Sequence, residues 1–247
     1  MEAARARGQR HVVIDPRRTE TADAADIHLP LAPQTDVRLW NGLLADLIRR
    51  GAADRTWIAD HVAGFKTVLA SLATADQSHS AIASDCGVDE DLLRRFYTLF
   101  AETPRTVSLF SMGANQSAQG VAKGSAIINA HLATGRIGKP GACPFSITGQ
   151  PNAMGGREVG GLANMLACHL DIENPTHRAA VQTFWHAPRI ADKPGLKAVD
   201  LFRAVEEKRI KALWIMCTNP SVSLPRADKM RGALGRLVWM LVTIGPV

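Results

Sequence analysis

The chain has 247 residues, 46% hydrophobic and 21% charged, which is ordinary for a globular protein long enough to bury a sizeable core. Only 5% of the residues are aromatic and one is tyrosine, which argues against a base-stacking nucleic-acid surface. The formal charge of +6 is uneven, because residues 187–236 carry 11 basic and 5 acidic side chains while residues 1–186 carry 18 of each. This basic third fits an anionic cofactor, an acidic partner or a solvated face, and we expect no nucleic acid.

Targeting and metal-binding signals are sparse. No apolar run approaches transmembrane length and no signal-peptide core opens the chain, so we expect a cytoplasmic protein without a membrane partner. The pair Arg17 and Arg18 precedes a polar Thr-Glu-Thr stretch, unlike an export signal. No CxxC pair occurs, which excludes a visible zinc ribbon or iron–sulfur set and favours reduced thiols. The four cysteines are Cys86, Cys143, Cys168 and Cys217.

The first elements place an acid and two arginines after a strand. Residues 11–15 (HVVID) predict a short buried strand, and residues 27–31 (IHLPL) predict an edge strand limited by its proline. Strand ends are where open α/β sheets bind ligands. Asp15 would accept a hydrogen bond from a sugar hydroxyl or a guanine edge, and Arg17 or Arg18 would meet phosphate. A turn with solvated charges is the alternative interpretation.

A helix follows. Thr35 or Asp36 caps a run with apolar residues at helical spacing, which ends at Gly51. A helix start favours anions, so Gln34, Thr35 and Asp36 stand where a polar ligand would be held. Residues 54–103 are predicted helical, and we interpret them as packing.

The next strand, residues 105–112, leads into GANQSAQG and a helix over residues 115–134. Gly113 permits the turn, and Gln116 offers an amide near the helix start. This junction has neither a Walker ending nor a GxGxxG pattern. Residues 135–164 then predict one long glycine- and proline-rich connection, and connections of this length are usually functional or disordered.

The stretch TGQPNAMGGREVGGLAN, residues 148–164, holds five glycines. Glycine at this density weakens helix and strand and permits close backbone approach. Gln150, Asn152 and Arg157 supply donors that suit an anion or a polar cofactor edge. A long surface loop is the alternative interpretation.

The remaining residues predict helices and two strands. The strand 212–217 ends at a polar turn that contains Asn219. Asn219 therefore follows a predicted strand, as Asp15 and Gln116 also do. No helix follows the last strand, 237–242, so both chain ends look like cuts through a larger protein. The predicted helices cover residues 176–186, 195–210 and 225–234.

Three long blocks then carry a resemblance. They are DPRRTETADAADIHLPLAPQTDVRLWNGLL, SMGANQSAQGVAKGSAIINAHLATGRIGKPGACPFSITGQPNAMGGREVGGLAN and LFRAVEEKRIKALWIMCTNPSVSLP. Over roughly residues 10–236 the chain resembles the molybdopterin oxidoreductases of the dimethyl-sulfoxide-reductase superfamily, and within it the assimilatory nitrate reductase catalytic subunits. The resemblance implies an α/β fold with Rossmann-like parallel-sheet layers and flanking helices. It also implies a molybdenum bis-molybdopterin guanine dinucleotide cofactor that supports the reduction of nitrate to nitrite.

The resemblance further implies an organisation and a set of roles. Residues 1–60 would end one molybdopterin-binding layer, residues 61–104 would form a helical connection, and residues 105–247 would form a second layer with the active-site loop 135–164. Arg157 and Gln150 would face the molybdenum, Arg157 would hold nitrate, and Met112 would contact the cofactor beside the metal. The implied cofactor contacts are Asp15, Pro16, Arg17, Arg18, Gln34, Thr35, Asp36, Met112, Gly113, Gln116 and Asn219.

Departures from the family pattern leave alternatives open. The family's 4Fe-4S cysteines and its protein ligand to molybdenum lie upstream of the first block, so we assign no metal ligand in this chain. We therefore expect the chain alone to bind cofactor weakly and not to reduce nitrate in a viologen assay. A formate dehydrogenase-like enzyme and an inactive, truncated cofactor-binding module are the competing hypotheses. The electron donor would be ferredoxin, flavodoxin or a reductase subunit.

Overall fold

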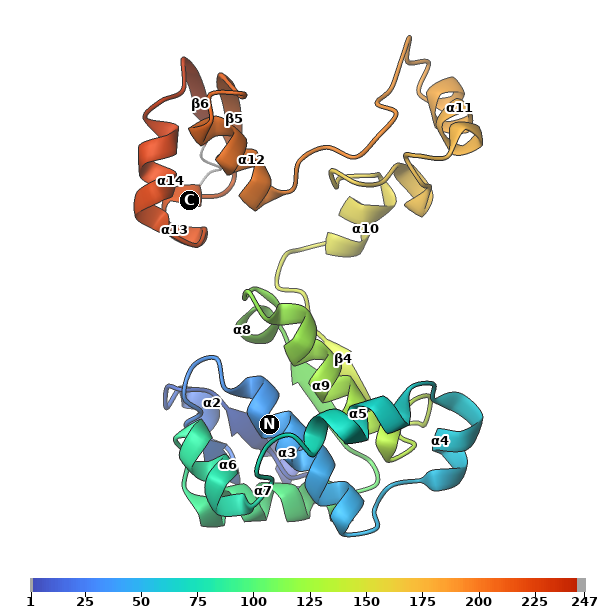
Figure 1. Ribbon diagram of the computed structural model, residues 1–247, viewed down its shortest axis with the longest axis vertical. Coiled ribbons are helices and arrows are strands. Elements are labelled where there is room, and N and C mark those ends of the chain that lie inside the picture. The colour runs from blue at the N-terminus through green and yellow to red at the C-terminus, as the bar shows by residue number, and fades with distance from the viewer. Residues whose placement is uncertain (1, 244–247) are drawn as a thin grey trace. The chain divides into compact units, whose positions relative to one another are not determined.

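The computed structural model describes residues 2–243 and divides into two compact units, one ending at Gly149 and the other beginning at Gln150 (Figure 1). The N-terminal unit contains two parallel strand pairs and the C-terminal unit contains one, and helical crossovers join the strands of each pair, as the expected Rossmann-like layers require. The described residues form three separate two-stranded sheets, β1–β2, β3–β4 and β5–β6. The mixed α/β fold with flanking helices is therefore confirmed.

The N-terminal unit holds two of these sheets. Val12 of β1 lies opposite Ile27 of β2, and Val107 of β3 lies opposite Cys143 of β4. Its elements are α1 (Glu2–Arg5), β1 (Val12–Ile14), α2 (Glu20–Asp23), β2 (Ile27–Leu29), α3 (Asp36–Arg49), α4 (Arg55–His61), α5 (Phe65–Leu72), α6 (His79–Cys86), α7 (Glu90–Glu102), β3 (Val107–Phe110), α8 (Met112–Asn115), α9 (Gly120–Ala133) and β4 (Cys143–Ser146).

Helix α3 is the centre of this unit, packed against α6, α7 and α9. Its leucines recur at helical spacing, and Leu39, Leu43 and Leu47 are fully buried. Gly42 lets the neighbouring helices approach, because a Cβ there would lie 2.7 Å from the Tyr97 hydroxyl. That hydroxyl donates a 2.6 Å hydrogen bond to the Leu39 carbonyl, which satisfies a buried polar group.

His131 on α9 is the buried titratable group with a clear pH consequence. It is fully buried, and its Nε2 lies 2.8 Å from the Ser108 hydroxyl on β3. Burial, together with the nearby Arg136 charge, lowers the pKa of His131 to about 4. Below pH ~6.5 His131 is protonated in the unfolded chain but stays neutral in the folded chain until the pH approaches ~4.

We therefore expect the unfolding free energy to fall by up to about 3 kcal/mol as the pH drops from ~6.5 to ~4. Urea melts across this pH range measure the slope. His131→Gln should flatten it, whereas His169→Gln, at an exposed histidine, should leave it unchanged. An unaltered slope in the His131 variant would contradict the assignment.

The C-terminal unit contains the third sheet, in which Ala212 of β5 lies opposite Trp239 of β6. Helices α12 and α14 pack together, and Phe202, Val205 and Met230 are buried there. Leu166 and Val181 belong to a second small apolar cluster. The elements are α10 (Ala153–Glu158), a 3-10 turn (Ala167–His169), α11 (Pro175–Phe184), α12 (Ala198–Glu206), β5 (Ala212–Met216), α13 (Pro220–Ser223), α14 (Ala227–Leu234) and β6 (Trp239–Thr243).

The structure corrects the expectation of one long connection over residues 135–164, because β4 and α10 lie inside it. The sequence did not indicate β4 because Pro144 lies in it and proline disfavours strands. It did not indicate α10 because Gly155 and Gly156 lie in it and glycine disfavours helices. The helix expected over residues 115–134 begins later than predicted, as α9 at Gly120, and a separate short helix, α8, ends at Asn115. The three-part organisation at residues 60 and 104 stays a prediction.

Candidate functional site

The carboxyl edge of β1–β2 brings the first predicted residues together. Asp15 follows β1, the segment with Gln34 follows β2, and parallel strands end at the same edge. The Asp15 amide donates to the Leu29 carbonyl at 3.2 Å, and its Oδ1 accepts from the Arg17 amide at 2.7 Å. This turn fixes the carboxylate beside exposed guanidinium groups. Pro16, Arg17 and Arg18 are exposed, and Arg18 pairs with Asp23 at 2.6 Å.

The start of α3 carries the second predicted contact. Gln34 is exposed with a φ of 75°, a left-handed conformation that a side chain rarely adopts. The Thr35 hydroxyl donates to the Ala32 carbonyl at 2.7 Å, so it does not cap the helix. Asp36 instead forms a 2.6 Å ion pair with Lys123 on α9.

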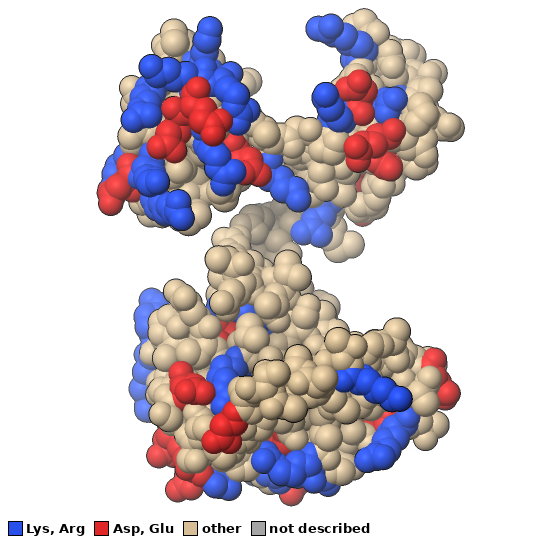
Figure 2. Space-filling model, in the orientation of Figure 1, with Lys and Arg blue, Asp and Glu red and all other residues tan. Residues whose placement is uncertain are grey.

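The carboxyl edge of β3–β4 places α8 beside the loop that follows β4. The side-chain amide nitrogen of Asn115 donates a hydrogen bond to the Ser146 hydroxyl at 3.2 Å. A Cβ at Gly149 would lie 3.6 Å from the Met112 methyl group. Met112 is 47% exposed, Gly113 and Gln116 are exposed, and Figure 2 shows mainly uncharged surface over α8. The edge therefore offers thioether and amide groups rather than charge.

The glycine-rich loop owes its shape to close backbone contacts. A Cβ at Gly160, where φ is 79°, would lie 2.8 Å from the Ala167 nitrogen. A Cβ at Gly161 would lie 2.6 Å from the Gly156 oxygen. Asn152, at φ 52°, accepts from the Gly155 amide at 3.3 Å and begins α10. Glycine is thus required at positions 160 and 161 for this fold of the chain.

Arg157 lies exposed on α10, and its guanidinium group makes no hydrogen bond or ion pair within the described residues. Gln150 is also exposed. A guanidinium group without a carboxylate partner has all its donors available to an anion, and its planar fork matches a planar oxyanion.

The carboxyl edge of β5–β6 borders a cavity of about 680 Å³. Asn219 lies on this cavity, directly after β5, and its side chain does not cap α13. The other lining residues are Ile215, Cys217, Thr218, Pro220, Ser221, Leu234, Met240, Val242 and Thr243. Polar groups at one end of an apolar hollow suit part of a large organic ligand.

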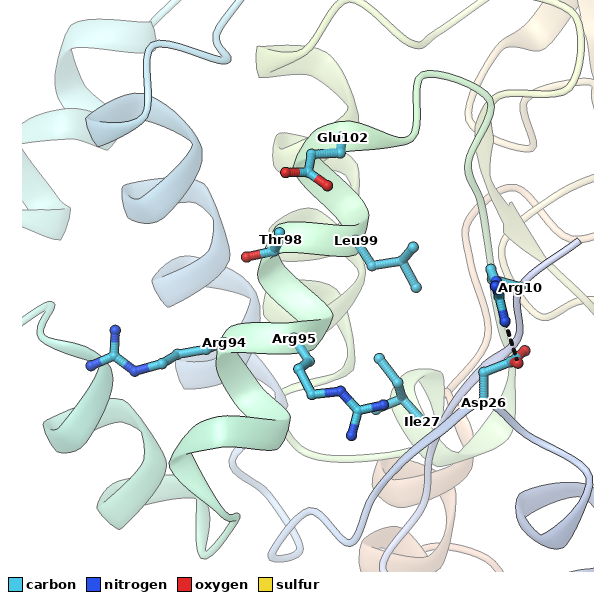
Figure 3. A pocket seen from close by; sticks show the side chains of 8 residues that line it. All are labelled: Arg10, Asp26, Ile27, Arg94, Arg95, Thr98, Leu99 and Glu102. Atoms are coloured by element: carbon cyan, nitrogen blue, oxygen red, sulfur yellow. Dashed lines mark hydrogen bonds and ion pairs between the residues drawn. The ribbon is translucent and has the colours of Figure 1, made fainter.

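A second hollow, of about 500 Å³, lies in the N-terminal unit between α7 and the start of β2, and contains none of the predicted site residues (Figure 3). Arg10 and Asp26 pair at 3.1 Å on one wall, and Arg94 on α7 points away from that pair. The lining residues are Arg10, Asp26, Ile27, Arg94, Arg95, Thr98, Leu99 and Glu102.

The basic C-terminal third presents mixed charge rather than a single basic patch. Figure 2 shows acidic and basic side chains interspersed over α12 and α14. Asp200 pairs with Arg203 at 2.9 Å, and Asp228 also carries an arginine partner, Arg231. This arrangement matches the solvated face that the sequence left open.

Over residues 2–243, no group of three or more acidic, histidine or cysteine side chains is arranged to hold a metal ion, and all four cysteines are free thiols. No described helix has both the length and the apolar character to cross a bilayer.

The N-terminal unit carries carboxylates and a guanidinium group that suit a nucleotide. Carboxylate oxygens at Asp15 and Asp36 suit a guanine or sugar edge, and the exposed Arg17 suits phosphate. The cavity beside Asn219 accommodates an organic portion. These groups follow strand ends, where the sequence predicted them, although each of the two units holds only some of them. Sequence reasoning missed Lys123, whose only signal was a charge on the buried side of an apolar helix.

Comparisons with known proteins point to one family. The sequence profile of molybdopterin oxidoreductases matches residues 1–244. Nitrate reductase from Klebsiella oxytoca is 47% identical over 235 residues, covering 95% of this chain and 26% of the relative. Nitrate reductase from Shewanella frigidimarina (strain NCIMB 400) is 43% identical over 98% of this chain and 26% of the relative. The assimilatory nitrate reductase catalytic subunit of Bacillus subtilis (strain 168) is 33% identical over 97% of this chain and 34% of the relative.

Among solved structures, acetylene hydratase from Pelobacter acetylenicus matches with a TM-score of 0.65 at 18% identity, over 98% of this chain and 35% of that one. This likeness concerns the fold. The chain spans about a quarter of the length of the first two relatives above. Because the family profile covers nearly every residue, this chain belongs to the molybdopterin oxidoreductase family.

Proposed function

We propose that this chain is part of a molybdenum-dependent nitrate reductase that binds bis-molybdopterin guanine dinucleotide and reduces nitrate to nitrite. The observation that carries the proposal is Arg157, an exposed guanidinium with no partner among the described residues, held by a glycine-rich segment whose backbone contacts fix it. The curated relatives named nitrate reductase, at 33–47% identity, support nitrate as the substrate.

Some residues of this chain would bind the cofactor, and Arg157 would bind the substrate. Asp15 and Asp36 would accept hydrogen bonds from nucleotide edges, and Arg17 would bind phosphate. Asn219 would hold another part of the cofactor at its cavity. When bound, the cofactor would supply the two-electron chemistry. Arg157 would bind the nitrate anion and orient its oxygens through two parallel hydrogen bonds.

Gln150, Met112, Gly113 and Gln116 would line the same reaction centre by uncharged contacts. The remaining contacts are the turn residues Pro16 and Arg18 and the α3-start residues Gln34 and Thr35. A 4Fe-4S cluster, with cysteines outside this sequence, and a ferredoxin, flavodoxin or reductase subunit would deliver electrons. We propose a cytoplasmic location for the enzyme.

A chimera tests the proposal. Residues 10–236 replace the matching segment of the Klebsiella oxytoca nitrate reductase, which is 47% identical. We expect the purified chimera to contain molybdenum and to oxidise reduced viologen when nitrate is added. A folded, molybdenum-loaded chimera that leaves nitrate unreduced would refute the proposal.

A further inference from the structure

The ion pair between Lys123 and Asp36 has features beyond packing. The Lys123 side chain is 5% exposed and lies in the first turn of α9, with its Nζ 2.6 Å from Asp36 Oδ2. Burying an ammonium group is costly, and a cation near a helix start is opposed by the helix dipole. A buried lysine is therefore held at this point only because the Asp36 carboxylate faces it.

The pair uses only half of the carboxylate. Asp36 Oδ2 faces Lys123, whereas its Oδ1 has no hydrogen bond within the part of the chain that the structure describes. The Asp36 side chain is 24% exposed, so a ligand can reach this side chain. It stands at the carboxyl edge of β1–β2, beside the left-handed Gln34.

We propose that Lys123 is a positioning residue, which fixes the Asp36 carboxylate so that its second oxygen meets a ligand edge carrying N–H donors. The inference rests on the proposed function, in which that edge is guanine. Guanine presents two adjacent kinds of N–H donor, at N1 and N2, to a carboxylate. Adenine presents an acceptor at its N1, which faces a carboxylate unfavourably. Lys123 also ties α3, which follows β2, to α9, which follows β3.

The test measures binding of GMP and AMP to the 247-residue chain by NMR titration, with the melting temperature as a second readout. Hydrogen bonds to a charged group predict a GMP preference of about tenfold or more in the unmodified chain. Lys123→Arg should retain this preference. Lys123→Met should reduce it to near unity, because the carboxylate is no longer held.

A charge-reversed double variant, Asp36→Lys with Lys123→Asp, separates positioning from simple pairing. It keeps the ion pair, so the melting temperature should stay close to that of the unmodified chain, yet the GMP preference should vanish. If folded Lys123→Met keeps the preference, Lys123 does not position Asp36 and the inference fails. If Lys123→Met does not fold, loss of the preference in folded Lys123→Arg overturns the inference and its retention supports it. An unmodified chain without any GMP preference would overturn the guanine site in the proposed function as well, a distinct result.

Discussion

Arg157→Ala, introduced into the chimeric nitrate reductase, should lower kcat/KM for nitrate by about 10- to 100-fold. The magnitude follows from losing hydrogen bonds between charged groups, which contribute about 1.5–3 kcal/mol. Molybdenum content should not change, because Arg157 is exposed on α10 and supports no neighbouring element by hydrogen bond or ion pair in the described chain. Steady-state viologen assays over a range of nitrate concentrations measure the effect.

Two further variants sharpen this result. Arg157→Lys keeps the charge but loses the planar fork, so an intermediate kcat/KM is expected. Arg203→Ala removes an exposed arginine on α12 that already pairs with Asp200, and it should leave kcat/KM unchanged. Equal activity of Arg157→Ala and the parent chimera would show that the guanidinium does not bind nitrate.

Gly120→Ala should destabilise the N-terminal unit by about 2–3 kcal/mol, the range for a side chain forced into filled space. A Cβ at Gly120 would lie 2.1 Å from the carbonyl oxygen of Asn115, and backbone cannot move aside as a flexible side chain does. The junction of α8 and α9 would have to shift, and α8 carries Met112. Urea denaturation measures the loss.

Gly124→Ala, one turn further along α9, is the matched control. Its Cβ would lie 3.9 Å from the Phe110 ring, an ordinary contact. Alanine favours a helix over glycine by about 1 kcal/mol, so this variant should be neutral or slightly more stable. Similar destabilisation by both variants would mean that glycine at position 120 has no special role.

The strands and long helices were predictable because their signals are local. The apolar residues of β1, β2 and α3 recur at the spacing that each element requires, and the structure places each within a few residues of its predicted span. The polar residues after strands, such as Asp15 and Asn219, were also found, since parallel sheets expose their carboxyl ends.

Tertiary contacts decided what the sequence did not reveal. Pro144 argues against a strand, yet β4 forms by pairing with β3. Helix α11 begins at Pro175, one residue before the expected start at 176, because proline suits the first helical position and the Asn174 side chain caps the helix by accepting from two amides. Lys123 pairs with a residue on a different helix, so no local pattern pointed to it.

In the glycine-rich segment, the residues that set the backbone path are different from the residue proposed to bind nitrate. Gly160 and Gly161 set the path of the chain by contacts to backbone atoms, whereas a Cβ at Gly156 would touch nothing within 4 Å. The guanidinium group of the neighbouring Arg157 likewise makes no hydrogen bond or ion pair within the described residues. Evolution can therefore exchange side chains at positions 156 and 157 without rebuilding the scaffold, which gives related enzymes a simple route to new substrates.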